Sequence, residues 1–254
     1  MKRWAWWAWL PLAVAVAVVL IVVGFLVWAL TPYGPDEAAA AALVSDEYVS
    51  VEETEDGWVV FTPEGDVPRV GLVLYPGGRV DPRAYAPLAR EVADRGYLVV
   101  VPPMTLNLAV LSPDRADEVI AAYPEIDSWA MAGHSLGGSM AARYTLENTG
   151  TIGALTLLAS YPGSADDLSD IDIDAVSAYG TRDGILDPDT FTESVDLLPH
   201  DAAFVEIEGG NHAQFGSYGP QAGDAGATIS AEDQQWEAAD AIGLAMRPLR
   251  IRTH

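Results

Sequence analysis

A serine flanked by glycines is the residue of this chain best suited to chemistry. The stretch Gly133-His134-Ser135-Leu136-Gly137 fits the pattern G-x-S-x-G and lies between an apolar run and a helix-like run. On a sharp strand-to-helix turn the hydroxyl of such a serine projects from the sheet, and glycines are needed because side chains would clash in so tight a turn. The pattern therefore predicts that Ser135 is a nucleophile, provided that the chain supplies a base and an acid.

The base is sought among the four histidines of the chain. A serine hydroxyl needs a base to accept its proton, and the base needs a group that orients it. His134 adjoins the nucleophile and its ring is expected to point away, His200 precedes a predicted strand, and His254 is terminal. His212 directly follows the last predicted strand. We therefore predict that His212 is the base, the alternative being a loop histidine bonded to nearby backbone.

The acid is expected in the loop after the predicted strand 175–179. Asp183 lies three residues past Gly180, close to the end of that strand. Asp187 lies one helical turn further and precedes Pro188, a placement typical of a helix N-cap. We therefore predict Asp183 as the acid, with Asp187 as the alternative.

Two backbone N–H groups are needed to stabilise the oxyanion of an acyl-transfer intermediate. Leu136, directly after the nucleophile, is expected to supply one. The loop after the first buried strand contains Gly77 and Gly78, and we choose Gly78 for the second, with Arg79 next, because adjacent glycines let the backbone approach a substrate. A simple tight turn is the alternative for this loop, and the Arg79 side chain either contacts a substrate carboxylate or is solvated.

A parallel sheet must bring these residues together. Two alternating runs, 48–52 and 58–62, predict an antiparallel hairpin, and continuous apolar runs typical of doubly buried strands follow. The predicted buried strands are 70–75, 97–101, 128–132, 152–160, 175–179 and 203–207, and the predicted helices are 82–95, 113–123, 139–148 and 231–246. Their alternation indicates an α/β fold with a mostly parallel sheet flanked by helices. Ligands collect at the carboxyl ends of such strands, where the candidate site residues lie.

Composition restricts the function further. The chain has 254 residues, half of them hydrophobic, which is enough for one α/β domain with a core and an appendage. The net charge of −24, from 13 basic and 37 acidic residues, argues against nucleic acid as a partner. The absence of cysteine excludes disulfides, thiolate catalysis and zinc–sulfur sites. No metal or cofactor is predicted. The acidity favours a halophilic source, with an ordinary acidic extracellular protein as the alternative.

The N-terminal 30 residues are predicted to be a membrane anchor. Residues 4–30 carry no charge and are longer than the apolar region of a signal peptide, and tryptophans lie near both ends. Lys2 and Arg3 precede this run, so the positive-inside rule places the N-terminus in the cytoplasm and the domain outside. The alternative is a cleaved signal peptide and a secreted protein. Residues 31–46 are expected to form a stalk, or alternatively a first helix packed on the domain, and residues 47–254 are expected to form the α/β domain.

Four stretches resemble the α/β-hydrolase superfamily, and in particular the group called alpha/beta hydrolase fold-5. They are LVLYPGGRVDPRAYAPLA, GHSLGG, YGTRDGILD and IEGGNHAQFG, within a region from about residue 70 to residue 245. The resemblance implies Ser135 as nucleophile, Asp183 as acid and His212 as base, and the hydrolysis of an ester-like bond in a small or medium substrate. Many relatives insert a helical cap after the sixth strand, but residues 161–174 are too short for one. Acyl transfer by the same residues, and a non-catalytic binding domain, are the alternatives.

Overall fold

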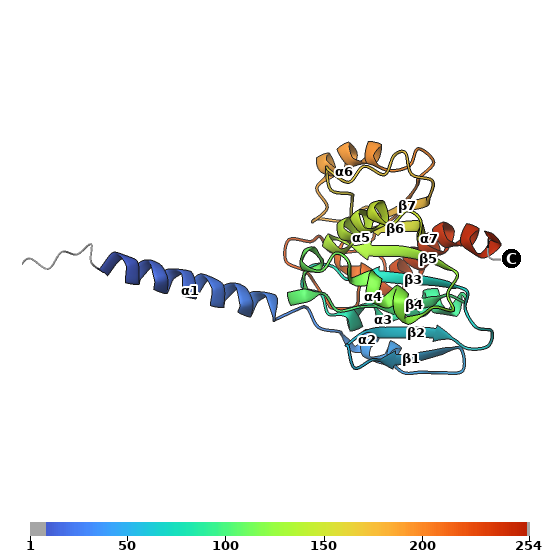
Figure 1. Cartoon of the computed structure of the whole chain (residues 1–254), viewed down its shortest axis with the longest axis horizontal. Helices are drawn as coiled ribbons and strands as arrows, with labels where there is room; N and C mark the ends of the chain where they lie inside the picture. Colours follow the sequence, from blue (N-terminus) through green and yellow to red (C-terminus); the bar gives the residue numbers. More distant parts are fainter. Residues whose placement is uncertain (1–8, 253–254) are drawn as a thin grey trace, which may run out of the picture.

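One mixed sheet forms the centre of the computed structural model, which describes residues 9–252 (Figure 1). Its eight strands run in the order β1-β2-β4-β3-β5-β6-β7-β8. Strands β1 and β2 form the predicted antiparallel hairpin, β2 is antiparallel to β4, and all later neighbours are parallel. The bounds are β1 Val49–Glu53, β2 Val59–Pro63, β3 Val70–Tyr75, β4 Leu98–Val101, β5 Ser128–His134, β6 Ile152–Leu158, β7 Asp174–Gly180 and β8 Ala203–Ile207.

Helices cover both faces of this sheet because the central strands are apolar on both sides. In β3, Leu72 and Leu74 belong to one hydrophobic cluster, and Val73 and Tyr75 belong to the other. The first cluster includes side chains of α3 and α7, and the second includes side chains of α4 and α5. These helices are α3 Ala86–Asp94, α4 Arg115–Ala122, α5 Leu136–Glu147 and α7 Ala231–Arg252. The predicted fold class is confirmed: a mostly parallel sheet between two helical layers.

Some element boundaries differ from those predicted. The predicted helix 82–95 begins as a 3₁₀ turn, η2 (Pro82–Tyr85), before α3. Helix α7 runs past the predicted end at Met246 and includes Pro248. Its last turns continue because Leu249 is buried in the core, where its side chain lies directly over Gly153 of β6. Tertiary packing there outweighs the helix-breaking tendency of proline.

Residues 31–46 pack on the domain. This agrees with the alternative, a first helix packed on the domain, and not with a free stalk. Helix α2 (Glu37–Ala42) lies against α3, and its Ala39 is fully buried. Its N-cap Asp36 donates its backbone N–H to the carbonyl of Ser217 at 2.9 Å. The side chain of Arg90 in α3 donates to the carbonyl of Ala42 at 3.1 Å. The small alanine side chains of α2 allow this close approach, and the contacts fix the segment to the domain surface.

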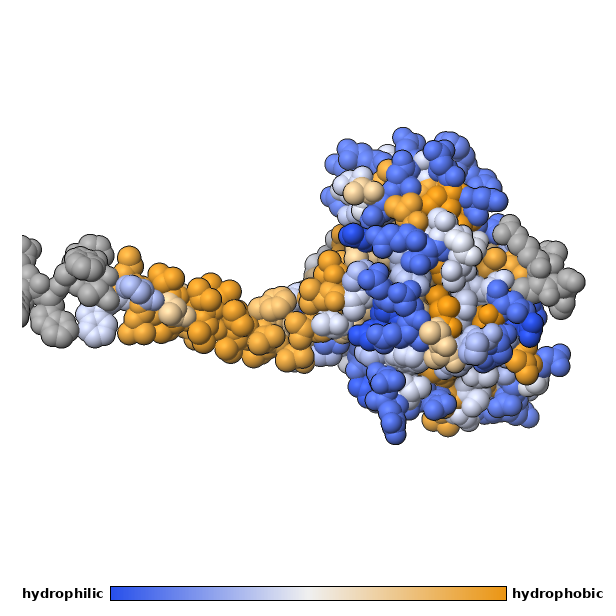
Figure 2. Space-filling view, viewed as in Figure 1, coloured by the Kyte–Doolittle hydropathy of each residue, from blue (hydrophilic) through white to orange (hydrophobic). Residues whose placement is uncertain are grey.

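Helix α1 (Leu10–Ala29) extends away from the domain and is apolar along its whole length (Figures 1 and 2). It is long and apolar enough to cross a membrane, although a signal sequence has the same properties. The residues expected at the start of the anchor, Lys2, Arg3 and the tryptophans up to Trp7, lie outside the described residues.

The connection between β6 and β7, residues 159–173, contains no helix. The carboxyl edge of the sheet therefore carries no helical insertion at the point where many relatives have a cap. Helix α6 (Pro188–Ser194) and the 3₁₀ turn η5 (Val195–Leu197) follow β7 instead.

Candidate active site

Ser135 sits on the sharp turn that the glycine pattern predicts, between β5 and α5. Its backbone adopts φ 52° and ψ −124°, a strained conformation for a residue with a side chain. A Cβ atom on Gly133 would lie 2.4 Å from the carbonyl oxygen of Gly137, and one on Gly137 would lie 2.3 Å from the carbonyl oxygen of Pro76. The two glycines are therefore required by close backbone approach, and this approach holds the half-buried serine at the turn.

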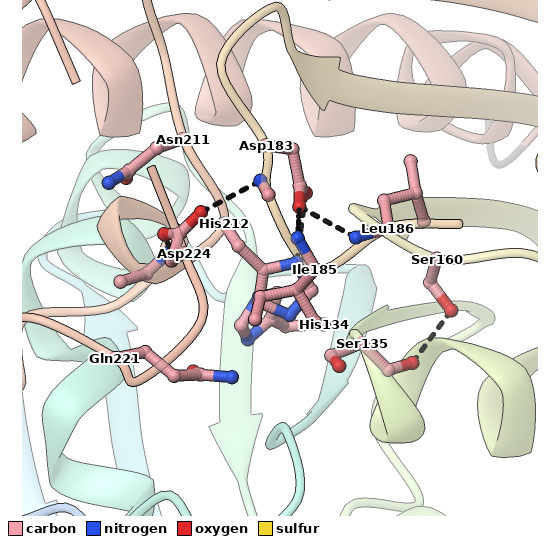
Figure 3. A network of polar contacts seen from close by, with 12 residues as sticks. His134, Ser135, Ser160, Asp183, Ile185, Leu186, Asn211, His212, Gln221 and Asp224 are labelled. Atoms are coloured by element: carbon pink, nitrogen blue, oxygen red, sulfur yellow. Dashed lines mark hydrogen bonds and ion pairs between the residues drawn. The ribbon is translucent and has the colours of Figure 1, made fainter. Parts of the chain in front are cut away.

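Asp183 and His212 form a buried pair beside this turn (Figure 3). Oδ2 of Asp183 lies 2.8 Å from Nδ1 of His212, and the two side chains are only 3 % and 2 % exposed. The other carboxylate oxygen accepts the backbone N–H groups of Ile185 and Leu186, each at 2.8 Å. A carboxylate held in this way accepts a hydrogen bond from the Nδ1–H of His212 and leaves Nε2 as the basic nitrogen of the ring.

The loops that carry the pair are fixed against each other. A Cβ atom on Gly180 would lie 2.3 Å from the carbonyl oxygen of Gly210, so the loops after β7 and β8 touch through their backbones. Gln234 of α7 accepts the N–H of Asn211 at 2.9 Å and donates to its carbonyl at 2.6 Å. This two-way contact aligns the residue directly before His212, so that the ring orientation is set by the core helix as well as by Asp183.

His212 and Ser135 line the same pocket, of about 250 Å³. Its other lining residues are Leu136, Ser139, Ala159, Ser160, Tyr161, Ile185 and Leu186. Nε2 of His212 is buried and has no hydrogen-bond partner within the described chain. A buried acceptor without a partner is costly, and an incoming hydroxyl or substrate group would satisfy it. The arrangement suits a base that takes a proton from the Ser135 hydroxyl.

The two candidate oxyanion donors also lie together. A Cβ atom on Gly78 would be 3.4 Å from Cδ2 of Leu136, so the two residues are neighbours. Within the described chain, neither of their backbone N–H groups donates to another protein group. Arg79, the second choice, is unsuitable because its N–H donates to the carbonyl of Asn107 at 2.7 Å. Its side chain is partly exposed, donates to the carbonyls of Trp28 and Thr31, and does not line the pocket.

The alternatives weighed for acid and base lie elsewhere. The side chain of Asp187 caps helix α6 by accepting the N–H of Thr190 at 2.8 Å, as its position before a proline predicts. His200 is exposed and precedes β8, at the opposite edge of the sheet from Ser135. Neither residue lines the pocket that Ser135 and His212 share.

The sequence predicts the direction of the His134 ring but not its contacts. Its ring points away from the pocket but packs on His212, with ring centroids 4.6 Å apart. The Tyr85 hydroxyl accepts the N–H of Gly77 and lies at hydrogen-bond distance, 2.8 Å, from Nδ1 of His134. Burial, together with the neighbouring His212, holds the pKa of His134 well below its usual range. The neutral ring therefore links the glycine loop, the nucleophile turn and the base.

Two further residues of the site escape sequence reasoning. The Ser160 hydroxyl donates to the carbonyl of Ser135 at 2.6 Å and so holds the strained turn (Figure 3). The position of Ser160 could have been predicted, because it follows the strand next to β5 and the carboxyl ends of parallel strands meet at one edge of the sheet. Tyr85 gives no such signal, since its position fits the apolar face of a helix. Among the residues described, no cluster of histidine and acidic side chains is suited to hold a metal ion.

Comparisons with known proteins agree with the fold. The sequence model of the alpha/beta hydrolase family matches residues 71–237, about two thirds of the chain. A search of curated proteins finds no match. Among solved structures, the esterase domain of a Rhodothermus marinus protein is similar, with a TM-score of 0.57 and 12% identity over 79% of this chain and 97% of that one. At this identity the likeness shows the fold alone. The family match spans the strands and loops that carry Ser135, Asp183 and His212, and the chain therefore belongs to the alpha/beta hydrolase family.

Proposed function

We propose that the protein is a serine hydrolase that cleaves a carboxylic ester of small or medium size through an acyl-enzyme on Ser135. One observation carries this proposal. The buried Asp183–His212 pair presents an unpartnered Nε2 to the pocket that contains Ser135. The family match supports hydrolysis as the reaction class, and the similarity to an esterase domain supports an ester as the substrate.

In the first half of the reaction, Nε2 of His212 takes the proton of the Ser135 hydroxyl as Oγ attacks the ester carbonyl. Negative charge develops on the carbonyl oxygen and is stabilised by the N–H groups of Gly78 and Leu136. The Asp183 carboxylate stabilises the imidazolium that forms. The tetrahedral intermediate then collapses, the C–O bond to the alcohol breaks, and His212 gives its proton to the leaving oxygen.

In the second half, a water molecule replaces the alcohol. Nε2 of His212 takes a proton from this water, which attacks the acyl carbonyl bound to Ser135. Collapse releases the carboxylic acid and returns the proton to Oγ. The same base and the same two N–H donors therefore serve both halves, and an acceptor alcohol in place of water would give acyl transfer.

A fluorophosphonate probe tests the nucleophile and the base. We expect labelling of the wild-type protein at Ser135 and no labelling of Ser135→Ala or His212→Gln. His200→Gln is the matched control, because it makes the same change at an exposed histidine outside the pocket. An unlabelled wild type would favour a binding domain without catalysis. Product analysis with a competing alcohol separates hydrolysis from acyl transfer.

We further propose that α1 is an uncleaved anchor in the cell membrane, with the N-terminus cytoplasmic and the domain outside. The length and mean hydropathy of α1, 20 residues and 3.1, support this. Sequencing the N-terminus of the mature protein tests it. A mature chain that begins near residue 30 would favour the secreted alternative.

A further inference from the structure

The end of α1 is fixed to the domain by two side chains. Arg79 donates from Nε to the carbonyl of Trp28 at 2.7 Å and from Nη2 to the carbonyl of Thr31 at 2.6 Å. Asn107 donates from Nδ2 to the carbonyl of Ala29 at 2.9 Å. Ala29 is fully buried at this contact. Carbonyls at the end of a helix lack partners within the helix, so these bonds satisfy groups that would otherwise need water.

The charge of Arg79 strengthens this contact. A cation near the C-terminus of a helix is favoured by the helix dipole. The guanidinium also lies over two rings, 4.6 Å from the centroid of Trp28 and 5.5 Å from that of Tyr33. Hydrogen bonds, dipole and ring contacts act together on the last turn of α1. The helix therefore leaves the domain in a defined direction instead of swinging on a linker.

The two residues that hold α1 belong to the catalytic edge of the sheet. Arg79 directly follows Gly78, the candidate oxyanion donor, and its N–H donates to the carbonyl of Asn107. Arg79, Leu106 and Asn107 all have positive φ angles, between 52° and 60°, in loops that follow β3 and β4. Figure 1 shows α1 leaving the domain at the edge toward which the β3 and β5 arrows point. The membrane helix and the pocket are therefore on the same side of the domain.

Apolar side chains extend from α1 onto this side. The 3₁₀ turn η3 (Thr105–Asn107) contacts α1, and η4 (Ala109–Leu111) follows it directly. Leu30, Val110 and Leu111 are exposed there, although most of the domain surface is polar (Figure 2). Exposed apolar side chains next to a membrane helix fit the hydrocarbon and headgroup boundary of a bilayer.

We propose that the catalytic edge faces the bilayer and that the substrate is an amphiphilic ester whose hydrocarbon chain stays in the membrane. This rests on the proposed ester hydrolysis and the proposed anchor, and it limits the small or medium size of the proposed substrate to the part that enters the pocket. The pocket of about 250 Å³ is smaller than the roughly 300–1,000 Å³ of sites that enclose a whole drug-sized ligand. It has room for the ester group and a short adjoining part, while the bilayer holds the rest. The covalent steps are those given for Ser135.

The test compares two esters of one leaving group on the full chain reconstituted in vesicles of an ether-linked phosphatidylcholine, which contains no carboxylic ester. Water-soluble 4-methylumbelliferyl acetate reports the chemistry, and 4-methylumbelliferyl oleate in the vesicles reports access from the bilayer. The variant is Val110→Glu, at a side chain 50 % exposed on the proposed membrane side. The matched control is Val67→Glu, at a valine 66 % exposed before β3, at the opposite edge of the sheet.

We expect hydrolysis of both esters by the wild type, and a fall of at least about threefold in the oleate-to-acetate rate ratio for Val110→Glu, because a charge replaces an apolar group at the interface. Val67→Glu should keep the wild-type ratio. Equal oleate-to-acetate rate ratios in the two variants, or a wild type that hydrolyses acetate and not vesicle-bound oleate, would overturn this inference but not the proposed function. No hydrolysis of either ester, together with no fluorophosphonate labelling of Ser135, would overturn the proposed function and this inference with it.

Discussion

Replacing Asp183 by asparagine tests the proposed acid without disturbing the fold. The carboxylate accepts the N–H groups of Ile185 and Leu186 through one oxygen and faces Nδ1 of His212 with the other. The asparagine carbonyl can keep the two backbone bonds, so its NH₂ group must face Nδ1. His212 then carries its proton on Nε2 and cannot accept one from Ser135.

The expected loss follows from charge and tautomer. An imidazolium and a carboxylate about 4 Å apart interact by about 4 kcal/mol at an effective dielectric constant of about 20, which corresponds to about 10³-fold in rate. The wrong tautomer adds to this loss. We therefore expect kcat for 4-methylumbelliferyl acetate to fall by about 10³- to 10⁴-fold in Asp183→Asn, with the melting temperature nearly unchanged.

Asp187→Asn is the matched control. It makes the same substitution four residues away, at a side chain that caps α6 and does not touch His212. Asparagine caps helices about as well as aspartate, so activity and stability should stay close to wild type. If Asp183→Asn keeps more than about a tenth of the activity, or if Asp187→Asn loses as much, the assignment of the acid is wrong.

Three other predictions concern stability. Burial holds the pKa of His134 well below its usual 6.5, so below about pH 6.5 the unfolded chain binds a proton that the native protein does not. The free energy of unfolding therefore decreases as the pH is lowered, by up to about 1.4 kcal/mol per pH unit. His134→Asn should flatten this slope in denaturant titrations, and parallel profiles would contradict it. Gly137→Ala should lose at least about 2 kcal/mol, because its Cβ would meet the Pro76 carbonyl, whereas Gly150→Ala, with nothing within 4 Å, should lose less than about 0.5 kcal/mol. If the net charge of −24 marks a halophile, the melting temperature should rise as KCl shortens the Debye length from about 10 Å to about 3 Å, and an unchanged value would refute that origin.

The fold could be predicted from the sequence because its signals are local. Apolar runs such as Val70–Tyr75 require burial on both faces, and their alternation with amphipathic helices leaves a parallel sheet as the compact solution. The turn around Ser135 was predictable for the same reason, since its glycines are required by backbone contacts within and beside the turn. The placement of the Asp183 and His212 loops at one edge followed from strand direction alone.

Contacts between distant segments were decided only by the tertiary structure. Nothing local distinguishes Tyr85 from a core aromatic residue, yet its hydroxyl joins Gly77 to His134. Arg79 resembles a solvated or substrate-binding arginine until the end of α1 comes within reach of its guanidinium. Residues 31–46 have the composition of a stalk, but small side chains let α2 pack on α3. The sequence by itself pointed to Ser135, Asp183 and His212 as candidates, because periodicity and turn chemistry act over a few residues. The tertiary structure decided what orients them and which way the anchor leaves, because those bonds join segments up to 78 residues apart.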